Sequence, residues 1–196
     1  MRYKADITAG GLKMRESRII ADLLLKGADK EVWNTEIEDR NILQTRSPET
    51  ARRLLRLIRG RLALMTPEHW VMVHDGSKDL AVQAVFAAAV KHSALLGDFL
   101  DLRLRQEYQI FTEMVPATIW NHYLEGCKSR DPEMPDWNVS TIKRLRSSVF
   151  QMLTEAGYLA ASRSRKLQKV HLMADLKTYL EEQNEQYVLR CMTACL

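Results

Sequence analysis

Apolar residues recur with a helical period between residues 46 and 65. Ser47 is a favourable N-cap residue, and Pro48 suits the first helical position, where the backbone N–H has no partner within the helix. The pattern therefore predicts an amphipathic helix that begins after Ser47. The apolar positions that follow are spaced by three and four residues, which places them on one buried face; they are Ala51, Leu54, Leu55, Ile58, Leu62 and Met65.

Similar patterns predict further helices through the first two thirds of the chain. Glu16 to Lys26 is a short amphipathic stretch that is followed by a glycine, a favourable residue for ending a helix. The stretch from 79 to 93 is so rich in alanine and valine that we expect a helix buried on most sides. Residues 129–137 contain two prolines and few apolar side chains, which is typical of a linker. The sequence thus predicts a helical bundle over residues 1–128.

The pattern changes after this linker. Residues 141–156 have the spacing of an amphipathic helix, and two short apolar segments, 158–159 and 167–172, are separated by a basic turn at 161–165. A helix followed by two short strands is the order found at the end of a winged-helix module. We therefore expect a mostly α protein whose smaller C-terminal part, residues 138–196, is winged-helix-like and contains a short β-hairpin. An all-helical C-terminal part is the alternative.

Charge is distributed unevenly along the chain. The net charge is only +4, but residues 46–65 and 141–170 together carry thirteen basic and two acidic side chains. The remaining residues carry 16 basic and 23 acidic side chains, so the rest of the chain is mildly acidic. Two basic segments on such a body favour a localised polyanionic partner, and nucleic acid is the commonest one.

We expect each basic segment to supply one DNA-binding surface. At 100° per residue, Arg52, Arg56 and Arg59 form a single row beside the apolar face of their helix, whereas Arg61 flanks the other side. For any one cation the alternative is an ordinary solvated face. Contacts from Arg and Lys to phosphates give affinity without sequence preference. The expected contacts to double-stranded DNA are Arg52, Arg53, Arg56, Arg59, Lys143, Arg144, Arg146, Arg163, Arg165 and Lys166.

The sequence contains no arrangement typical of catalysis. It has no P-loop, GxGxxG or GxSxG pattern, and no histidine is spaced from another ligand as in a metal site. Asp98 and Asp101 lie one helical turn apart, and we expect a solvated edge or a salt bridge to Arg103 or Arg105 rather than acid–base chemistry. The sequence therefore predicts no enzyme activity, no cofactor, no metal and no small-molecule substrate.

Cysteine content and hydropathy predict the compartment. The three cysteines have no CxxC spacing, which fits a reducing cytoplasm. No segment approaches the roughly 20 apolar residues of a membrane span, and the first residues lack the apolar core of a secretory signal. We therefore expect a cytoplasmic protein without a membrane partner.

Several stretches resemble one known family. ADITAGGLKMRESRIIADLLLKG, NILQTRSPETARRLLRLIRGRL, AVKHSALLGDFL, LRSSVFQMLTEAGYL and YVLRCM are similar to the BrxA proteins of BREX bacteriophage-exclusion systems. The resemblance implies a small, non-enzymatic, cytoplasmic component of a phage-defence operon, with a helical fold like that of the NusB antitermination proteins and with affinity for double-stranded DNA. The alternatives are an adaptor that binds other BREX proteins and an RNA-binding protein like NusB.

Overall fold

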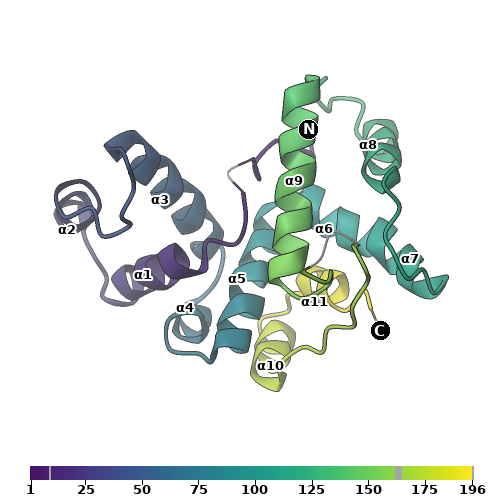
Figure 1. The fold of residues 1–196 in the computed structure, drawn as a ribbon. Helices are drawn as coiled ribbons and strands as arrows, with labels where there is room; N and C mark the ends of the chain where they lie inside the picture. Colours follow the sequence, from purple (N-terminus) through teal and green to yellow (C-terminus); the bar gives the residue numbers. More distant parts are fainter. Residues whose placement is uncertain (9, 162–164, 196) are drawn as a thin grey trace.

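The computed structural model describes residues 1–8, 10–161 and 165–195, and these are arranged as a set of helices (Figure 1). The first half contains α1 (Met14–Leu25), α2 (Lys30–Asn34), α3 (Pro48–Leu62), α4 (Pro67–His74) and α5 (Lys78–His92). The second half contains α6 (Ala94–Asp98), α7 (Arg105–Gln109), α8 (Ile119–Arg130), α9 (Val139–Glu155), α10 (Ala174–Glu182) and α11 (Gln186–Met192). Two π-helical segments, η1 (Thr35–Asp39) and η2 (Phe99–Leu104), continue α2 and α6.

Helix α3 begins and packs as the sequence predicts. The Ser47 hydroxyl accepts a hydrogen bond of 3.3 Å from the Thr50 N–H, and Pro48 occupies the first helical position. The predicted apolar face is confirmed, with Leu55 only half-buried and the other five positions buried. Because this face packs against α1, α5 and η1, the opposite side of α3 is left for solvent.

Helix α5 lies at the centre of the molecule (Figure 1). It packs against α1, α3, α4, α10 and α11. Residues 84–90 are buried on every side, because alanine lets neighbouring helices approach closely. The predicted burial of this helix is confirmed. Among the described helices none alone is long and apolar enough to span a membrane, although Lys78–His92 and Ala94–Gln109, bent by 105°, meet that criterion as a pair.

The predicted β-hairpin is wrong. Within the described parts of the C-terminal segment no strand forms, and the only pairing between the two predicted strands is an isolated antiparallel bridge from Leu159 to Leu167. Lys166 forms its own bridge with Met114 instead, in the loop before α8. Each of these bridges spans a single residue pair, and the Tyr158 and Leu159 N–H groups donate to the Leu153 carbonyl in α9, so no ladder extends from Leu159. The mostly α class is confirmed, and residues 1–8, 10–161 and 165–195 form no sheet.

The segment between α8 and α9 is anchored to the start of the chain. The Asp131 carboxylate accepts hydrogen bonds from the backbone N–H groups of Arg2 at 2.5 Å and Tyr3 at 3.2 Å. Met134 is buried, and Asn138 caps α9 by accepting from the Thr141 N–H at 2.8 Å. The division of the chain at residues 129–137, and the likeness to NusB, stay predictions.

A buried histidine predicts a pH-dependent stability. The Nε2 atom of His69 lies 2.9 Å from the Ala84 carbonyl oxygen, and burial lowers the pKa of His69 to about 4. The unfolded chain therefore binds a proton that the folded chain rejects, so stability is complete above pH 6.5 and falls below it. We expect His69 to reduce the free energy of unfolding by about 2 kcal/mol between pH 7 and pH 5. Urea unfolding at both pH values checks this, because His69→Gln should lose that part of the pH dependence.

Candidate nucleic-acid interface

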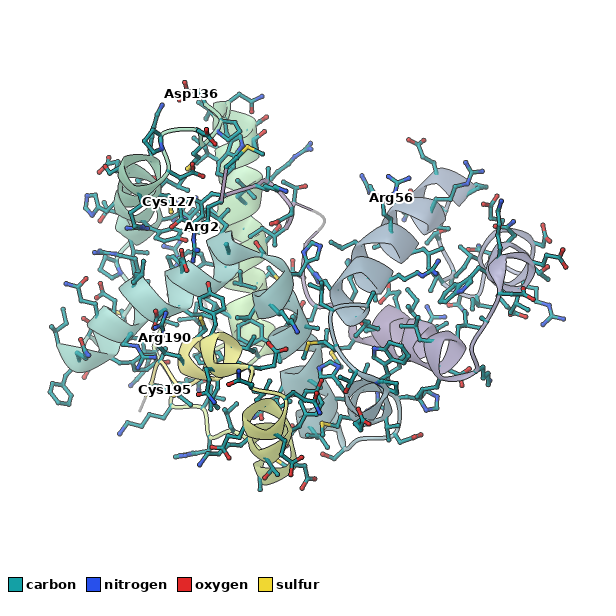
Figure 2. All side chains as sticks on the ribbon, turned by 180° about the vertical axis from the view of Figure 1, so that it is seen from behind. Arg2, Arg56, Cys127, Asp136, Arg190 and Cys195 are labelled. Atoms are coloured by element: carbon teal, nitrogen blue, oxygen red, sulfur yellow. The ribbon has the colours of Figure 1, made fainter. Side chains whose placement is uncertain are left out.

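The outer side of α3 presents the arginines that the sequence predicts. Arg52, Arg53, Arg56 and Arg59 are all exposed, and the helix carries one acid, Glu49, near its start. Figure 2 shows Arg56 on the side of α3 that faces away from α1. Within the described residues, Arg53 and Arg56 form no ion pair, so their charges are available to an anionic partner.

Two of these arginines also contact the preceding elements. The guanidinium group of Arg52 donates to both oxygens of Glu38 in η1, at 3.1 and 3.2 Å. Arg59 lies over the Trp33 ring of α2, 5.0 Å from its centroid, within the range of a cation–π contact. The pair with Glu38 is exposed and therefore contributes little stability. Arg52 is accordingly the weakest member of this row as a phosphate ligand, whereas Arg59 keeps its charge exposed.

Arg61 is separated from this row by burial. Its side chain points into the interior, and its Nη2 atom lies 3.9 Å from the sulfur of Met152 in α9. Burial lowers the pKa of Arg61 to about 10, while the carboxylates of Asp6 and Glu155 partly oppose this effect. A group enclosed in this way cannot reach a nucleic-acid phosphate, so Arg61 links α3 to α9 instead.

The first half of α9 presents the second predicted group of cations. Lys143 and Arg144 are exposed, and together with Ser147 they line a shallow surface pocket of about 290 Å³ beside Thr8. Arg146 is half-buried, with its guanidinium carbon 5.9 Å from the centroid of the Phe150 ring. None of these three cations forms an ion pair with another described residue. The predicted helix surface is therefore cationic in the folded chain.

Arg165 and Lys166 join this surface from the segment before α10. Arg165 lies over the Phe150 ring, 5.1 Å from its centroid, so guanidinium groups from α9 and from the segment before α10 both contact this ring. Lys166 is exposed. Arg163, which the sequence also predicts as a contact, lies outside the described residues. Phe150 thus brings together Arg146 and Arg165, two predicted contacts that are 19 positions apart.

The two basic groups lie on different helices. In Figure 1 the chain from the N-terminus to α1 passes between α3 and α9, and Arg61 with Met152 joins these helices at one end. The α3 surface consists of Arg52, Arg53, Arg56 and Arg59. The α9 surface consists of Lys143, Arg144, Arg146, Arg165 and Lys166.

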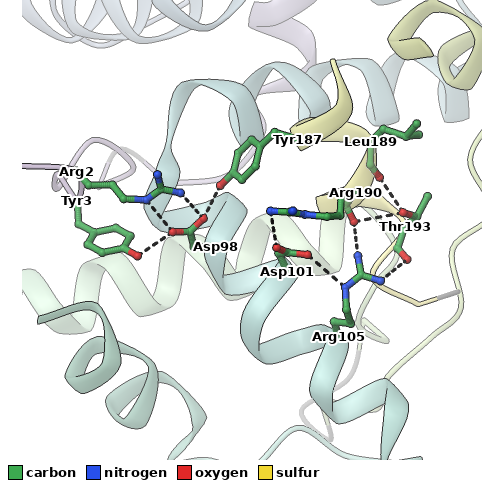
Figure 3. A network of polar contacts seen from close by, with 9 residues as sticks. All are labelled: Arg2, Tyr3, Asp98, Asp101, Arg105, Tyr187, Leu189, Arg190 and Thr193. Carbon is green, nitrogen blue, oxygen red and sulfur yellow. Dashed lines mark hydrogen bonds and ion pairs between the residues drawn. The ribbon is translucent and has the colours of Figure 1, made fainter. Parts of the chain in front are cut away.

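The most heavily hydrogen-bonded acidic side chain among the described residues is Asp98, and its partners are not those that the sequence predicts. Asp98, at the end of α6, accepts from the Arg2 guanidinium at 2.8 and 2.9 Å and from the hydroxyls of Tyr3 and Tyr187 at 2.7 Å each (Figure 3). The expected solvated edge at Asp98 is therefore wrong, because the residue is 5% exposed. Asp101 does pair with Arg105, as expected, and also with Arg190 of α11.

Comparison with known proteins identifies the family. The family model BrxA matches residues 1–184. The chain belongs to the BrxA family. The BREX protein BrxA of Paramagnetospirillum magneticum is 51% identical over 97% of this chain and 96% of its own length. The BREX protein BrxA of Escherichia coli O9:H4 is 33% identical over 92% of this chain and 85% of its own length.

A solved structure agrees with the fold of this BrxA-family chain. The crystal structure of an uncharacterized protein from Magnetospirillum magneticum superposes with a TM-score of 0.92 at 48% identity, and the match covers 99% of this chain and 100% of the other. The resemblance seen in the sequence is therefore confirmed. Membership of the BrxA family assigns no binding residue, so the α3 and α9 surfaces stay predictions from charge and geometry.

Proposed function

We propose that the chain is a non-enzymatic component of BREX phage defence that binds double-stranded DNA with little sequence preference. Its similarity to proteins named BREX protein BrxA supports the biological setting. The exposure of the cations on α3 and α9 carries the proposal for DNA, because among the described residues of the two surfaces only Arg52 has a carboxylate partner.

The composition of both surfaces favours phosphate binding over base reading. They present mainly Lys and Arg, which contact phosphates in any sequence, and the described residues place few amide side chains beside them. Arg146 and Arg165 are held against Phe150, which limits their freedom before any ligand binds. Such surfaces give affinity that depends on salt rather than on base sequence.

Chemistry at a reactive side chain is not part of the proposal. The described residues contain no group of three or more His, Cys, Asp or Glu side chains that could hold a metal ion. Cys127, Cys191 and Cys195 are buried, and burial raises the pKa of Cys191 to about 12. A thiol with such a pKa is a poor nucleophile at neutral pH. These observations support a binding role.

Salt dependence of duplex binding is the first test. If about five phosphates are neutralised, the logarithm of the association constant should fall against the logarithm of salt concentration with a slope of about −4 to −5. Fluorescence anisotropy with a labelled 30-mer duplex of unrelated sequence, measured at several salt concentrations, gives this slope. A second duplex of different sequence should give the same affinity at each salt concentration.

Two controls separate DNA binding from its alternatives. Single-stranded RNA should compete poorly for the labelled duplex, and stronger competition by RNA would favour an RNA-binding role. A complex with another BREX protein that survives nuclease treatment, together with absence of duplex binding at low salt, would favour the adaptor role. A flat response of duplex affinity to salt would contradict the proposed phosphate contacts.

A further inference from the structure

The turn that ends α7 has an unusual residue at its left-handed position. The Thr112 N–H donates to the Glu107 carbonyl at 2.9 Å and the Phe111 N–H donates to the Tyr108 carbonyl at 3.1 Å, which is the hydrogen-bond pattern of a Schellman motif. Phe111 has a φ of +55°, in the region where glycine is preferred because it has no Cβ. The fold alone would therefore favour glycine at position 111.

The Phe111 side chain gains nothing from burial. It is 90% exposed, more than any other large apolar side chain in the described part of the molecule. Its neighbours Ile110 and Met114 are 64% and 57% exposed, so the turn presents three large apolar side chains to solvent. An exposed apolar group at a strained backbone position contributes nothing to folding, and contiguous exposed apolar groups mark interaction sites.

Two lysines, Lys166 and Lys169, lie beside this apolar turn. Met114 forms a bridge with Lys166, the Val115 N–H donates to the Arg165 carbonyl at 3.1 Å, and these contacts fix the turn beside the α9 surface. Phe111, Lys166 and Lys169 line one surface pocket of about 470 Å³. Glu113 is the exposed acid in this region, and it is outnumbered by the neighbouring cations.

We propose that Phe111 inserts between base pairs of the duplex while Lys166 and Lys169 hold the flanking phosphates. This inference rests on the proposed DNA-binding function and assigns a role to the turn. An apolar side chain flanked by cations suits a base step, because every base presents an apolar face and phosphates lie on both sides of it. Figure 1 shows the end of α7 projecting from the side of the molecule opposite to α2 and α3, where a duplex can reach it.

Insertion predicts a bend in the DNA that phosphate contacts alone do not require. Apolar side chains that enter a base step kink the duplex by about 20–90°. We therefore propose to measure anisotropy and end-to-end energy transfer on one 30-mer duplex with a dye at each end. Phe111→Gly should bind about five- to a hundredfold more weakly and should abolish the bend, given the usual contribution of one base–aromatic contact. Phe111→Trp, which keeps an aromatic side chain, should bind and bend the duplex as the parent does.

The stability of the variants removes misfolding as an explanation. Phe111→Gly relieves the positive φ, so its thermal unfolding midpoint should equal or exceed that of the parent. Val71→Ala on α4 is a matched control, because Val71 is 45% exposed and lies outside the turn. It should leave affinity and bending unchanged.

The outcomes distinguish this inference from the proposed function. If Phe111→Gly binds and bends the duplex as the parent does, the insertion is overturned while DNA binding stands. If neither the parent nor any variant binds the duplex at low salt, both proposals fail. If Phe111→Gly abolishes self-association in sedimentation without changing duplex binding, the turn contacts a second copy of the chain, and the insertion is overturned.

Discussion

Replacing Lys143, Arg144 and Arg146 with glutamate in one variant is expected to weaken duplex binding by at least about a hundredfold at moderate salt. The change removes three phosphate contacts and adds three repulsive charges to the α9 surface. The fold should survive, because Lys143 and Arg144 are exposed, Arg146 is only half-buried and glutamate is a good helix former. Fluorescence anisotropy measures the affinity, and circular dichroism checks the helix content.

A charge-matched variant separates position from net charge. Lys26, Arg40 and Lys177 are exposed cations that each pair with an acid one helical turn away. Replacing these three with glutamate changes the net charge equally but leaves both proposed surfaces intact. We expect this control to bind within about threefold of the parent at moderate salt, since distant exposed charges are screened. Equal loss of affinity in both variants would contradict a localised DNA-binding surface.

Replacing Asp98 with alanine is expected to lower the free energy of unfolding by about 3 kcal/mol. The carboxylate is buried and accepts four hydrogen bonds from Arg2, Tyr3 and Tyr187, so its loss removes the acceptor that these three side chains share. The loss also releases the N-terminal segment from α11, because Asp98 is their common partner (Figure 3). Urea unfolding at pH 7 measures the change.

The acid dependence of stability tests the same carboxylate. Burial alone raises the pKa of Asp98, but the hydrogen bonds from Arg2, Tyr187 and Tyr3 outweigh it, so the pKa lies below its ordinary value. A lowered pKa means that the stabilisation is present above about pH 4, the unfolded value, and is lost as the pH falls through the folded value. The alanine variant should therefore lose less stability than the parent upon acidification.

An exposed aspartate provides the control for Asp98. Asp136 pairs with Lys128 at the surface, and its side chain is 86% exposed. Replacing Asp136 with alanine should change the free energy of unfolding by less than about 0.5 kcal/mol, because exposed ion pairs contribute little. If the Asp98 and Asp136 variants were equally stable, the buried network would have no structural role.

Local patterns predict the helices, because a helix depends on neighbours within a few residues. The Ser47 cap, the proline after it and the apolar face of α3 all appear as expected. The hairpin fails for the opposite reason. Lys166 pairs with Met114, which is 52 positions away, and spacing within the C-terminal part contains no sign of that partner.

The candidate site is predicted in composition but not in geometry. Charge counting finds both basic segments, whereas only the folded chain shows that Arg61 is buried, that Arg52 pairs with Glu38 and that two arginines contact the Phe150 ring. Phe111 has no sequence signal, because its exposure and positive φ become visible only at the end of α7. Asp98 likewise depends on partners about ninety residues away.

The hydrogen bonds that join Asp98 to residues near both ends of the chain affect how the chain folds as it is synthesised. Arg2 and Tyr187 reach Asp98 across separations of 96 and 89 residues, so the buried carboxylate lacks its full set of donors until residue 187 has left the ribosome. Contacts between such distant residues form late and slow the overall rate. A nascent chain that ends before α11 therefore lacks the Tyr187 hydrogen bond to Asp98 and the packing of α11 on α5 and η2, and such an incomplete fold is a natural substrate for chaperones until synthesis passes that point.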